Sequence, residues 1–144
     1  MDAASFNLDT WKNLALTYKH LEHLIDAFMP RTRRNNTYCK TLSGVSDERI
    51  KSVRTIDGLR EVFNNDRYHK VNFEAYSRHR TVEFRQHSGT TNFTKMENWI
   101  RFLNGLITFA KRSSLPSRMT LEGLPFLDGK QKLFFKLRTK KLAV

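Results

Sequence analysis

Apolar side chains recur every three or four residues along two long stretches of this chain, residues 8–29 and 94–112. This is the period of a helix that buries one face, so both stretches are predicted to be amphipathic helices. Asn7 or Asp9 can cap the first helix. The second opens on Thr-Lys-Met-Glu at residues 94–97, the pattern of a capping box.

Between these helices the pattern changes to an alternation of apolar and polar residues. In residues 70–76, Val71, Phe73 and Ala75 alternate with polar neighbours, which is typical of a half-buried strand. A second alternating run, residues 80–87, follows after a short basic connection. The two runs are predicted to form an antiparallel hairpin.

The rest of the chain completes an α+β fold. Residues 46–53 and 55–63 read as two short helices, and residues from about 127 to 142 as a last helix with six lysines and arginines. No linker or repeat divides the chain. We therefore predict a single domain, residues 1–144, in which a short antiparallel sheet at about 70–87 packs against the two amphipathic helices.

The net positive charge is the strongest indication in the composition that this protein has a partner. The chain has 26 Lys and Arg against 14 Asp and Glu, a net charge of +12. Residues 31–144 alone hold 24 basic and 10 acidic side chains, a net charge of +14. Such an excess repels itself in the compact state and is usually offset by a polyanion, most often nucleic acid. A basic surface that only aids solubility is the alternative.

The remaining composition favours a cytoplasmic protein. Cys39 is the single cysteine, which excludes an internal disulfide and fits a reducing compartment. The first residues are acidic and poor in apolar side chains, unlike a signal peptide. The most apolar stretch, residues 99–110, is interrupted by Arg101 and Asn104 and falls short of a membrane span. We expect no membrane partner.

The stretch TVEFRQHSGT, residues 81–90, carries the candidate chemistry. On a strand Glu83, Arg85 and His87 share one face, with successive side chains about 7 Å apart. Glu83 and Arg85 are then expected to point into one site without touching, and Asn72 to face it from the partner strand. A carboxylate can ligate Mg²⁺ and a guanidinium can hold phosphate. An exposed cross-strand ion pair of little energetic weight is the alternative, and periodicity alone favours it.

Two segments resemble a known family. Residues 72–111, NFEAYSRHRTVEFRQHSGTTNFTKMENWIRFLNGLITFAK, resemble the C-terminal core of the putative amidoligase family, which is similar in fold to glutamine synthetase and carboxylate–amine ligases. Residues 20–40 resemble the family's helix and the Arg-Arg and Tyr-Cys loop after it. The resemblance implies that Glu83 serves Mg²⁺ and Arg85 the phosphates of ATP, with the arginine pair 33–34 nearby.

One departure from the family pattern decides the functional prediction. Such ligases also need paired carboxylates, Glu-x-Glu, because two or three Mg²⁺ ions must be held for ATP chemistry. No acid-x-acid pair occurs in this chain, which starts at the family's first helix. We therefore predict a non-enzymatic binding protein on a truncated amidoligase-like scaffold, with no cofactor. The alternative is a carboxylate–amine ligase that uses ATP and Mg²⁺ and is completed by a second chain.

The predicted partner is nucleic acid, RNA rather than DNA, or a nucleoprotein complex, because arginines beside aromatic rings suit RNA recognition. A role as a phage- or plasmid-type accessory protein or inhibitor, and pairing with a partner protein or a second copy, stay open. The ancestral ligase site would be Asn72, Glu83 and Arg85, with Glu83 as the metal ligand. The predicted phosphate-binding residues are Arg31, Arg33, Arg34, Arg78, Arg80, Arg85, His87, Lys136, Arg138 and Lys140.

Overall fold

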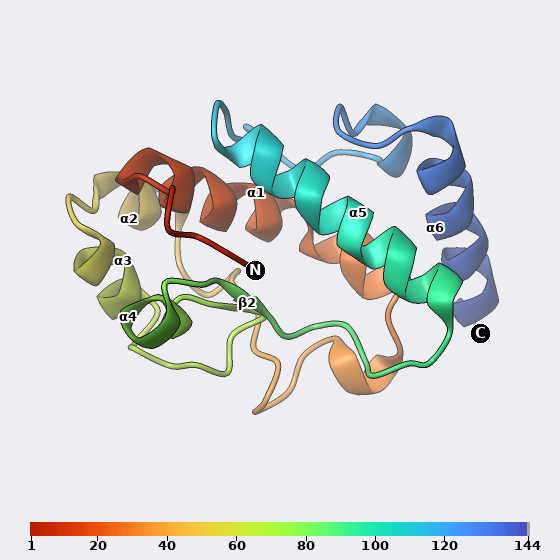
Figure 1. Cartoon of the computed structure of the whole chain (residues 1–144), viewed down its shortest axis with the longest axis horizontal. Coiled ribbons are helices and arrows are strands. Elements are labelled where there is room, and N and C mark those ends of the chain that lie inside the picture. Colours follow the sequence, from red (N-terminus) through yellow and green to blue (C-terminus); the bar gives the residue numbers. More distant parts are fainter. Residues whose placement is uncertain (144) are drawn as a thin grey trace.

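The computed structural model describes residues 1–143 and has an α+β fold in which helices predominate (Figure 1). Two strands form its antiparallel sheet. In chain order the elements are α1 (Leu8–Ala27), η1 (Arg31–Arg33), α2 (Asp47–Ser52), α3 (Ile56–Val62), β1 (Val71–Asn72), α4 (Ala75–His79), β2 (Glu83–Phe84), α5 (Phe93–Ala110), η2 (Leu121–Gly123) and α6 (Gly129–Leu142).

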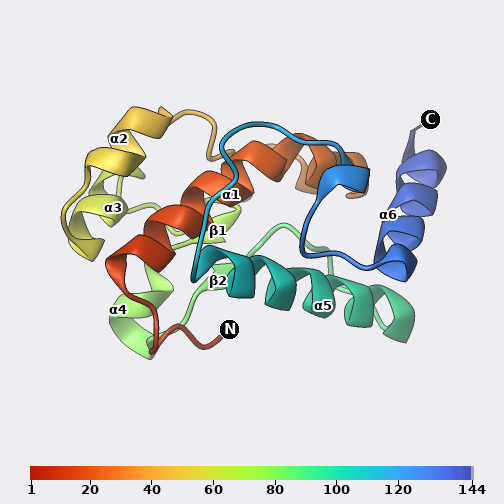
Figure 2. The ribbon, with the colours of Figure 1, turned by 90° about the horizontal axis from the view of Figure 1, so that it is seen from above.

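The two long amphipathic helices are confirmed as α1 and α5, which pack against each other. The short helices α2, α3 and α4 gather toward one end of α1, and α6 lies toward the other end (Figures 1 and 2). In the described residues no helix is long and apolar enough to cross a membrane.

Helix α1 is the centre of the core. Asn7 caps it by accepting the backbone N–H of Thr10 at 2.8 Å. Its first turns place Trp11, and its end places Phe28, among aromatic rings from distant segments. The rings around Trp11 are Phe6, Phe73 and Tyr76, and those around Phe28 are Trp99, Phe102 and Phe135. Helix α1 therefore contributes to the aromatic packing toward both ends of the molecule.

The end of α5 and the segment after it return to α1 through polar contacts. The Asn13 side chain donates to the carbonyl of Ala110 at 3.0 Å. Leu115 donates its N–H to the Thr17 hydroxyl, and its carbonyl lies 2.7 Å from Nδ1 of His20. Because Leu115 is itself buried, these bonds satisfy backbone groups that water cannot reach.

The predicted hairpin is present but much shorter than expected. Val71 pairs with Phe84, and Asn72 with Glu83, in antiparallel register. The prediction that the first strand runs to residue 76 was wrong, because residues 75–79 form the helix α4.

Side-chain contacts explain why the first strand stops. Oδ1 of Asn72 accepts the N–H of Glu74 at 2.9 Å, which turns the backbone out of the extended state. The helical turn that follows places Tyr76 edge-on to Trp11, at 5.3 Å between ring centroids. Arg80 ends the helix in the left-handed region with φ 54°.

Helix α5 begins differently from the prediction. Asn92 is the cap and accepts the N–H of Lys95 at 3.1 Å. The capping box predicted at residues 94–97 was therefore wrong; Glu97 pairs instead with Arg101 one turn later, at 2.8 Å. An asparagine two residues earlier caps at least as well as threonine, so the helix starts there.

The predicted basic C-terminal helix is confirmed as α6, which starts at Gly129 behind a capping box of Asp128 and Gln131. Gly105 on α5 lets the segment that leads into α6 approach closely. A Cβ atom at this position would lie 2.8 Å from the carbonyl oxygen of Phe126, too close for any side chain. Phe135 then enters the core beside Phe28.

A charged network fills the space between the hairpin and α1. Lys70, which is fully buried, lies with Nζ 2.9 Å from Oδ1 of Asp26 and 3.3 Å from Oε2 of Glu22. Glu22 also accepts the backbone N–H of Leu42 and the hydroxyl of Thr41. Every charge of this cluster therefore has a partner.

The network continues through Gln86, which lies two residues beyond the end of β2. Gln86 is fully buried; its Nε2 donates to Asp26, and its Oε1 accepts the hydroxyl of Tyr18 at 2.7 Å. Burial raises the pKa of Tyr18 well above its ordinary value, so this hydroxyl stays a donor at physiological pH.

Candidate functional site

An open cleft of about 660 Å³ lies over the hairpin. Asn72, Glu83 and Arg85 line it, on the face of the hairpin opposite to Phe84, which stacks on Tyr18 of α1. The sequence prediction that these three side chains share one site agrees with this arrangement. Register brings them together, because Asn72 and Glu83 are direct partners across the two strands.

Glu83 and Arg85 form an ion pair through Oε1 and Nη1. The expectation that the two side chains would not touch was therefore wrong. Although Arg85 follows Glu83 by two residues, just past the end of β2, the arginine stem is long enough to fold back to the carboxylate. Glu83 is 45% exposed and Arg85 is 25% exposed, so water and solutes reach both groups.

Arginine and tyrosine side chains meet at one wall of the cleft. The guanidinium groups of Arg67 and Arg85 lie 4.9 and 5.2 Å from the ring centroid of Tyr68. Arg67 also donates to the Tyr68 hydroxyl at 2.8 Å. Tyr38 packs edge-on against Tyr68 with 63% of its surface exposed. Cations stacked on aromatic faces are thus presented to solvent.

A second ion pair lies elsewhere in the cleft. Arg60 binds the carboxylate of Glu74 with two bonds, from Nε at 2.8 Å and from Nη2 at 3.0 Å. This pairing raises the pKa of Arg60 above its ordinary value. Arg78 and His79 of α4 complete the basic lining. The cleft therefore holds four arginines and one histidine against two carboxylates, both of them already paired.

The predicted loop arginines Arg33 and Arg34 donate hydrogen bonds to backbone carbonyls. Arg33 donates to the carbonyls of Arg85 and Gln86, and Arg34 to the carbonyl of Met29 at 3.1 Å. The first fixes η1 to the end of the second strand, and the second satisfies a carbonyl at the end of α1. Neither residue lines the cleft. Arg31 lies exposed in the same loop.

The other predicted cations are also dispersed. Arg80 covers the ring of Tyr76 at 5.2 Å and donates to its hydroxyl. Lys136 and Lys140 border a mostly apolar groove between α6, η2 and α1. Only Arg78 and Arg85 of the predicted phosphate-binding set lie in the cleft.

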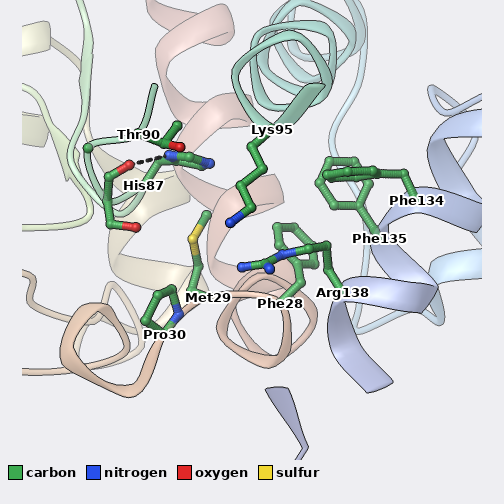
Figure 3. Close-up of a pocket in the computed structure, with 11 residues that line it drawn as sticks. Phe28, Met29, Pro30, His87, Thr90, Lys95, Phe134, Phe135 and Arg138 are labelled. Carbon is green, nitrogen blue, oxygen red and sulfur yellow. Dashed lines mark hydrogen bonds between the residues drawn. The ribbon is translucent and has the colours of Figure 1, made fainter. Parts of the chain in front are cut away.

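His87 does not share the face of Glu83 and Arg85. Because Gln86 is drawn into the core, the chain turns after Arg85, and His87 enters a separate pocket of about 110 Å³ (Figure 3). Arg138 reaches the same pocket from α6. Lys95 is the third basic residue there, and the sequence analysis missed it.

The sequence also missed Arg60, Arg67 and Glu74 as cleft residues. Arg67 stands next to Tyr68, and an arginine beside a tyrosine in a turn is the one signal that points to such a site. Nothing local singles out Arg60 and Glu74, because they pair across 14 residues.

The carboxylates of the cleft do not fit a Mg²⁺ site within this chain. Magnesium sites need carboxylate oxygens that are available to the metal, whereas Glu83 is held by Arg85 and Glu74 by Arg60. In residues 1–143 no group of three or more His, Cys, Asp or Glu side chains is close enough together to hold a metal ion.

Comparison with known families identifies the family of this chain. The family model described as "Putative amidoligase enzyme" matches residues 1–107. The chain belongs to this family. The match includes the whole cleft over the hairpin and most of α5, whereas α6 lies beyond it. No curated protein and no solved structure gives a significant match. The amidoligase relationship therefore rests on the family model and on the motif at residues 81–90.

Proposed function

We propose that this amidoligase-family chain is a binding protein for single-stranded nucleic acid, RNA in preference to DNA, and that the cleft over the hairpin is its binding surface. The observation that carries the proposal is the stacking of Arg67 and Arg85 on Tyr68 beside the exposed ring of Tyr38. Arginine forks hold phosphates, and tyrosine faces stack on bases.

The charge balance of the cleft supports a polyanionic ligand. With Glu83 and Glu74 already neutralised by Arg85 and Arg60, the exposed Arg67 and Arg78 remain as an excess of positive charge. The net charge of +14 on residues 31–144 adds long-range attraction for a phosphate backbone.

Asn72 supports the preference for RNA. Its Oδ1 accepts the N–H of Glu74, so its NH₂ group is left to donate into the cleft. A ribose 2′-hydroxyl can accept that hydrogen bond, and deoxyribose cannot. We expect a single-stranded RNA to bind more tightly than the DNA of the same sequence.

Binding to a fluorescent single-stranded RNA over a range of salt concentrations tests the proposal. Replacing Arg67 and Arg78 with glutamine removes two exposed cations, each of which contributes about 0.7 to the slope of log K against log salt. We expect the slope to fall by about 1.4 in this double variant. The matched control is the double variant Arg49→Gln and Arg54→Gln, two exposed arginines of the α2 region outside the cleft.

Two outcomes would count against this function. One is the absence of nucleic-acid binding even at low salt. The other is an equal loss of affinity in the cleft variant and in the control variant, because binding would then follow total charge rather than the cleft.

A second candidate function is amide-bond formation by an ATP-dependent ligase, and one specific observation favours it. Asn72, Glu83 and Arg85 lie together in one cleft, as the family motif implies, in a chain of the amidoligase family. Because this chain has no acid-x-acid pair, a second polypeptide would have to provide carboxylates for the metal ions.

Calorimetry with ATP and Mg²⁺ separates the two candidates. The ligase predicts nucleotide binding that needs Mg²⁺ and is lost in Glu83→Gln. The binding protein predicts no such heat signal and retains RNA binding in the same variant.

A further inference from the structure

The small pocket behind the turn after β2 is lined by basic side chains from three elements. His87 follows the second strand, Lys95 comes from the first turn of α5, and Arg138 comes from α6. Figure 3 shows that the Lys95 ammonium and the Arg138 guanidinium point toward each other, with the His87 ring beside them. Residues 87, 95 and 138, which lie 8 and 43 residues apart in sequence, thus converge on one space.

The pocket lacks a counter-charge. No Asp or Glu lines it, and within residues 1–143 neither Lys95 nor Arg138 forms an ion pair or a side-chain hydrogen bond. Both are partly buried, where two like charges repel more strongly than they do in water. An anion between them would remove that repulsion.

The histidine is arranged to serve as a third donor. Nδ1 of His87 lies 2.6 Å from the carbonyl oxygen of Ser88. Because a carbonyl only accepts, Nδ1 carries the proton, and Nε2 is left to take up a second proton. The ring packs against Trp99 at 5.4 Å between centroids, which fixes its orientation.

The charges that face His87 come from three elements. Burial is the main cause that lowers the pKa of His87, and Arg138 of α6, Lys95 of α5 and Arg33 of η1 lower it further. An anion bound beside these cations would offset the effect of their charges, though not that of burial, and would favour the protonated ring.

Size limits the ligand. The pocket volume of about 110 Å³ is about a sixth of the 660 Å³ of the cleft over the hairpin. A space of this size suits one tetrahedral anion rather than a nucleoside. Ser88 and Thr90 also line this space, and hydroxyl groups can donate to anionic oxygens.

We propose that this pocket binds a single phosphate group, with Lys95, Arg138 and protonated His87 as its charged partners. The site is independent of the nucleic-acid cleft. It depends on α6, which lies beyond residue 107, where the family match ends. The phosphate is either free inorganic phosphate or the terminal phosphate of a larger molecule, since both present the same group to the pocket.

The test follows the His87 ring by NMR in the full chain during addition of inorganic phosphate. We expect saturable shifts of the His87 signals and a rise in the pKa of His87 with phosphate bound. Replacing Lys95 or Arg138 with glutamine should weaken phosphate binding about tenfold or more, because each removes a charge-assisted hydrogen bond. Lys136→Gln is the matched control, since Lys136 lies on the same helix outside the pocket.

A comparison of short RNAs with a 5′-phosphate or a 5′-hydroxyl identifies the source of the phosphate. Displacement of inorganic phosphate by the 5′-phosphorylated RNA alone supports the pocket with a terminal phosphate as ligand. No displacement by either RNA supports the pocket with free phosphate as ligand.

Two results would overturn the proposal. One is a His87 signal that does not respond to phosphate. The other is equal weakening by Arg138→Gln and Lys136→Gln. The double variant Arg67→Gln and Arg78→Gln should bind inorganic phosphate unchanged, so failure of the pocket and failure of the cleft are distinguishable.

Discussion

The two faces of the short hairpin carry the same kinds of charged side chain, but these side chains differ in their exposure to water. On the inner face Lys70 pairs with Glu22 and Asp26; the Lys70 side chain has no exposed surface and Glu22 has 7%, whereas Asp26, at 30%, is partly open to water. On the outer face Glu83 and Arg85 also pair, but 45% and 25% of their side-chain surfaces remain exposed. The charges are alike, but Lys70 and Glu22 are closed to water, whereas both members of the outer pair are open to it.

This difference shows where charged residues stabilise the fold and where they are available for a ligand. Removing one partner from a buried cluster leaves an uncompensated charge in a low dielectric, which is costly. An exposed pair contributes little, because water replaces the lost partner. The inner face should therefore respond to mutation in stability, and the outer face in binding.

The largest expected effect is from Lys70→Ala. The change leaves Glu22 and Asp26 without their cation beneath the hairpin, and we expect a loss of about 3–5 kcal/mol in the free energy of unfolding. Urea denaturation measures it. As a control, Lys51→Ala on the exposed surface of α2 should change stability by less than about 0.5 kcal/mol. Similar values for both variants would remove the distinction between the two faces.

Tyr18→Phe is the next test of the inner face. It deletes the hydroxyl that donates to Oε1 of Gln86 and leaves this buried oxygen unpaired, at an expected cost of about 1–3 kcal/mol. Thermal and urea unfolding both report it. Tyr38→Phe is the control, because Tyr38 is 63% exposed and its hydroxyl is open to water. If the two variants are equally stable, the hydrogen bond to Gln86 contributes nothing.

The ion pair of Asp47 with Lys19 lies between the inner and outer faces of the hairpin in its exposure. It tests whether the loss of stability on mutation follows burial. Asp47 is 31% exposed, and the hydrogen bond from Lys19, followed by the one from His20, lowers the pKa of Asp47 below its ordinary value. Its contribution is therefore complete above about pH 4 and is lost as pH falls through the lowered pKa.

We expect Asp47→Asn to be less stable than the parent chain by about 1 kcal/mol at pH 7. The difference should shrink as the pH falls below about 4. Urea denaturation of both chains at pH 7 and at a pH below about 4 measures this difference. A constant difference at all pH values would show that the lost interaction does not depend on the ionised carboxylate.

The smallest effect on stability is expected on the outer face. Glu83→Gln should change the free energy of unfolding by less than about 1 kcal/mol, while it releases Arg85 for phosphate. RNA affinity should then rise, and the salt slope should steepen by about 0.7. Glu48→Gln, an exposed acid of α2, is the matched control for net charge. A loss of RNA binding in Glu83→Gln alone would contradict the proposed cleft.

The sequence was sufficient for the long helices and for the grouping of Asn72, Glu83 and Arg85. A helical period over 18 or 20 residues admits few other structures. The alternation at Val71, Phe73 and Ala75 is too short to show whether the strand continues or ends in a helical turn. The strand ends where the Asn72 side chain accepts the N–H of Glu74.

Long-range pairing could not be predicted from local pattern. Lys70 finds its carboxylates 44 and 48 residues away, and nothing in its neighbourhood marks it as buried. Lys95 and Arg138 come together only because α6 docks on the core through Phe135. Such sites depend on tertiary packing rather than on residue spacing.

The position of α1 affects how the chain acquires its structure. Its polar partners Ala110 and Leu115 follow it by 95 to 98 residues. At a translation rate of about 5–20 residues per second, α1 leaves the ribosome roughly 5–20 s before these partners exist. During that time α1 can pack on earlier partners such as Phe6, Phe73 and Tyr76, but the side that α5 covers stays open to water, and the closure of such distant contacts is slow.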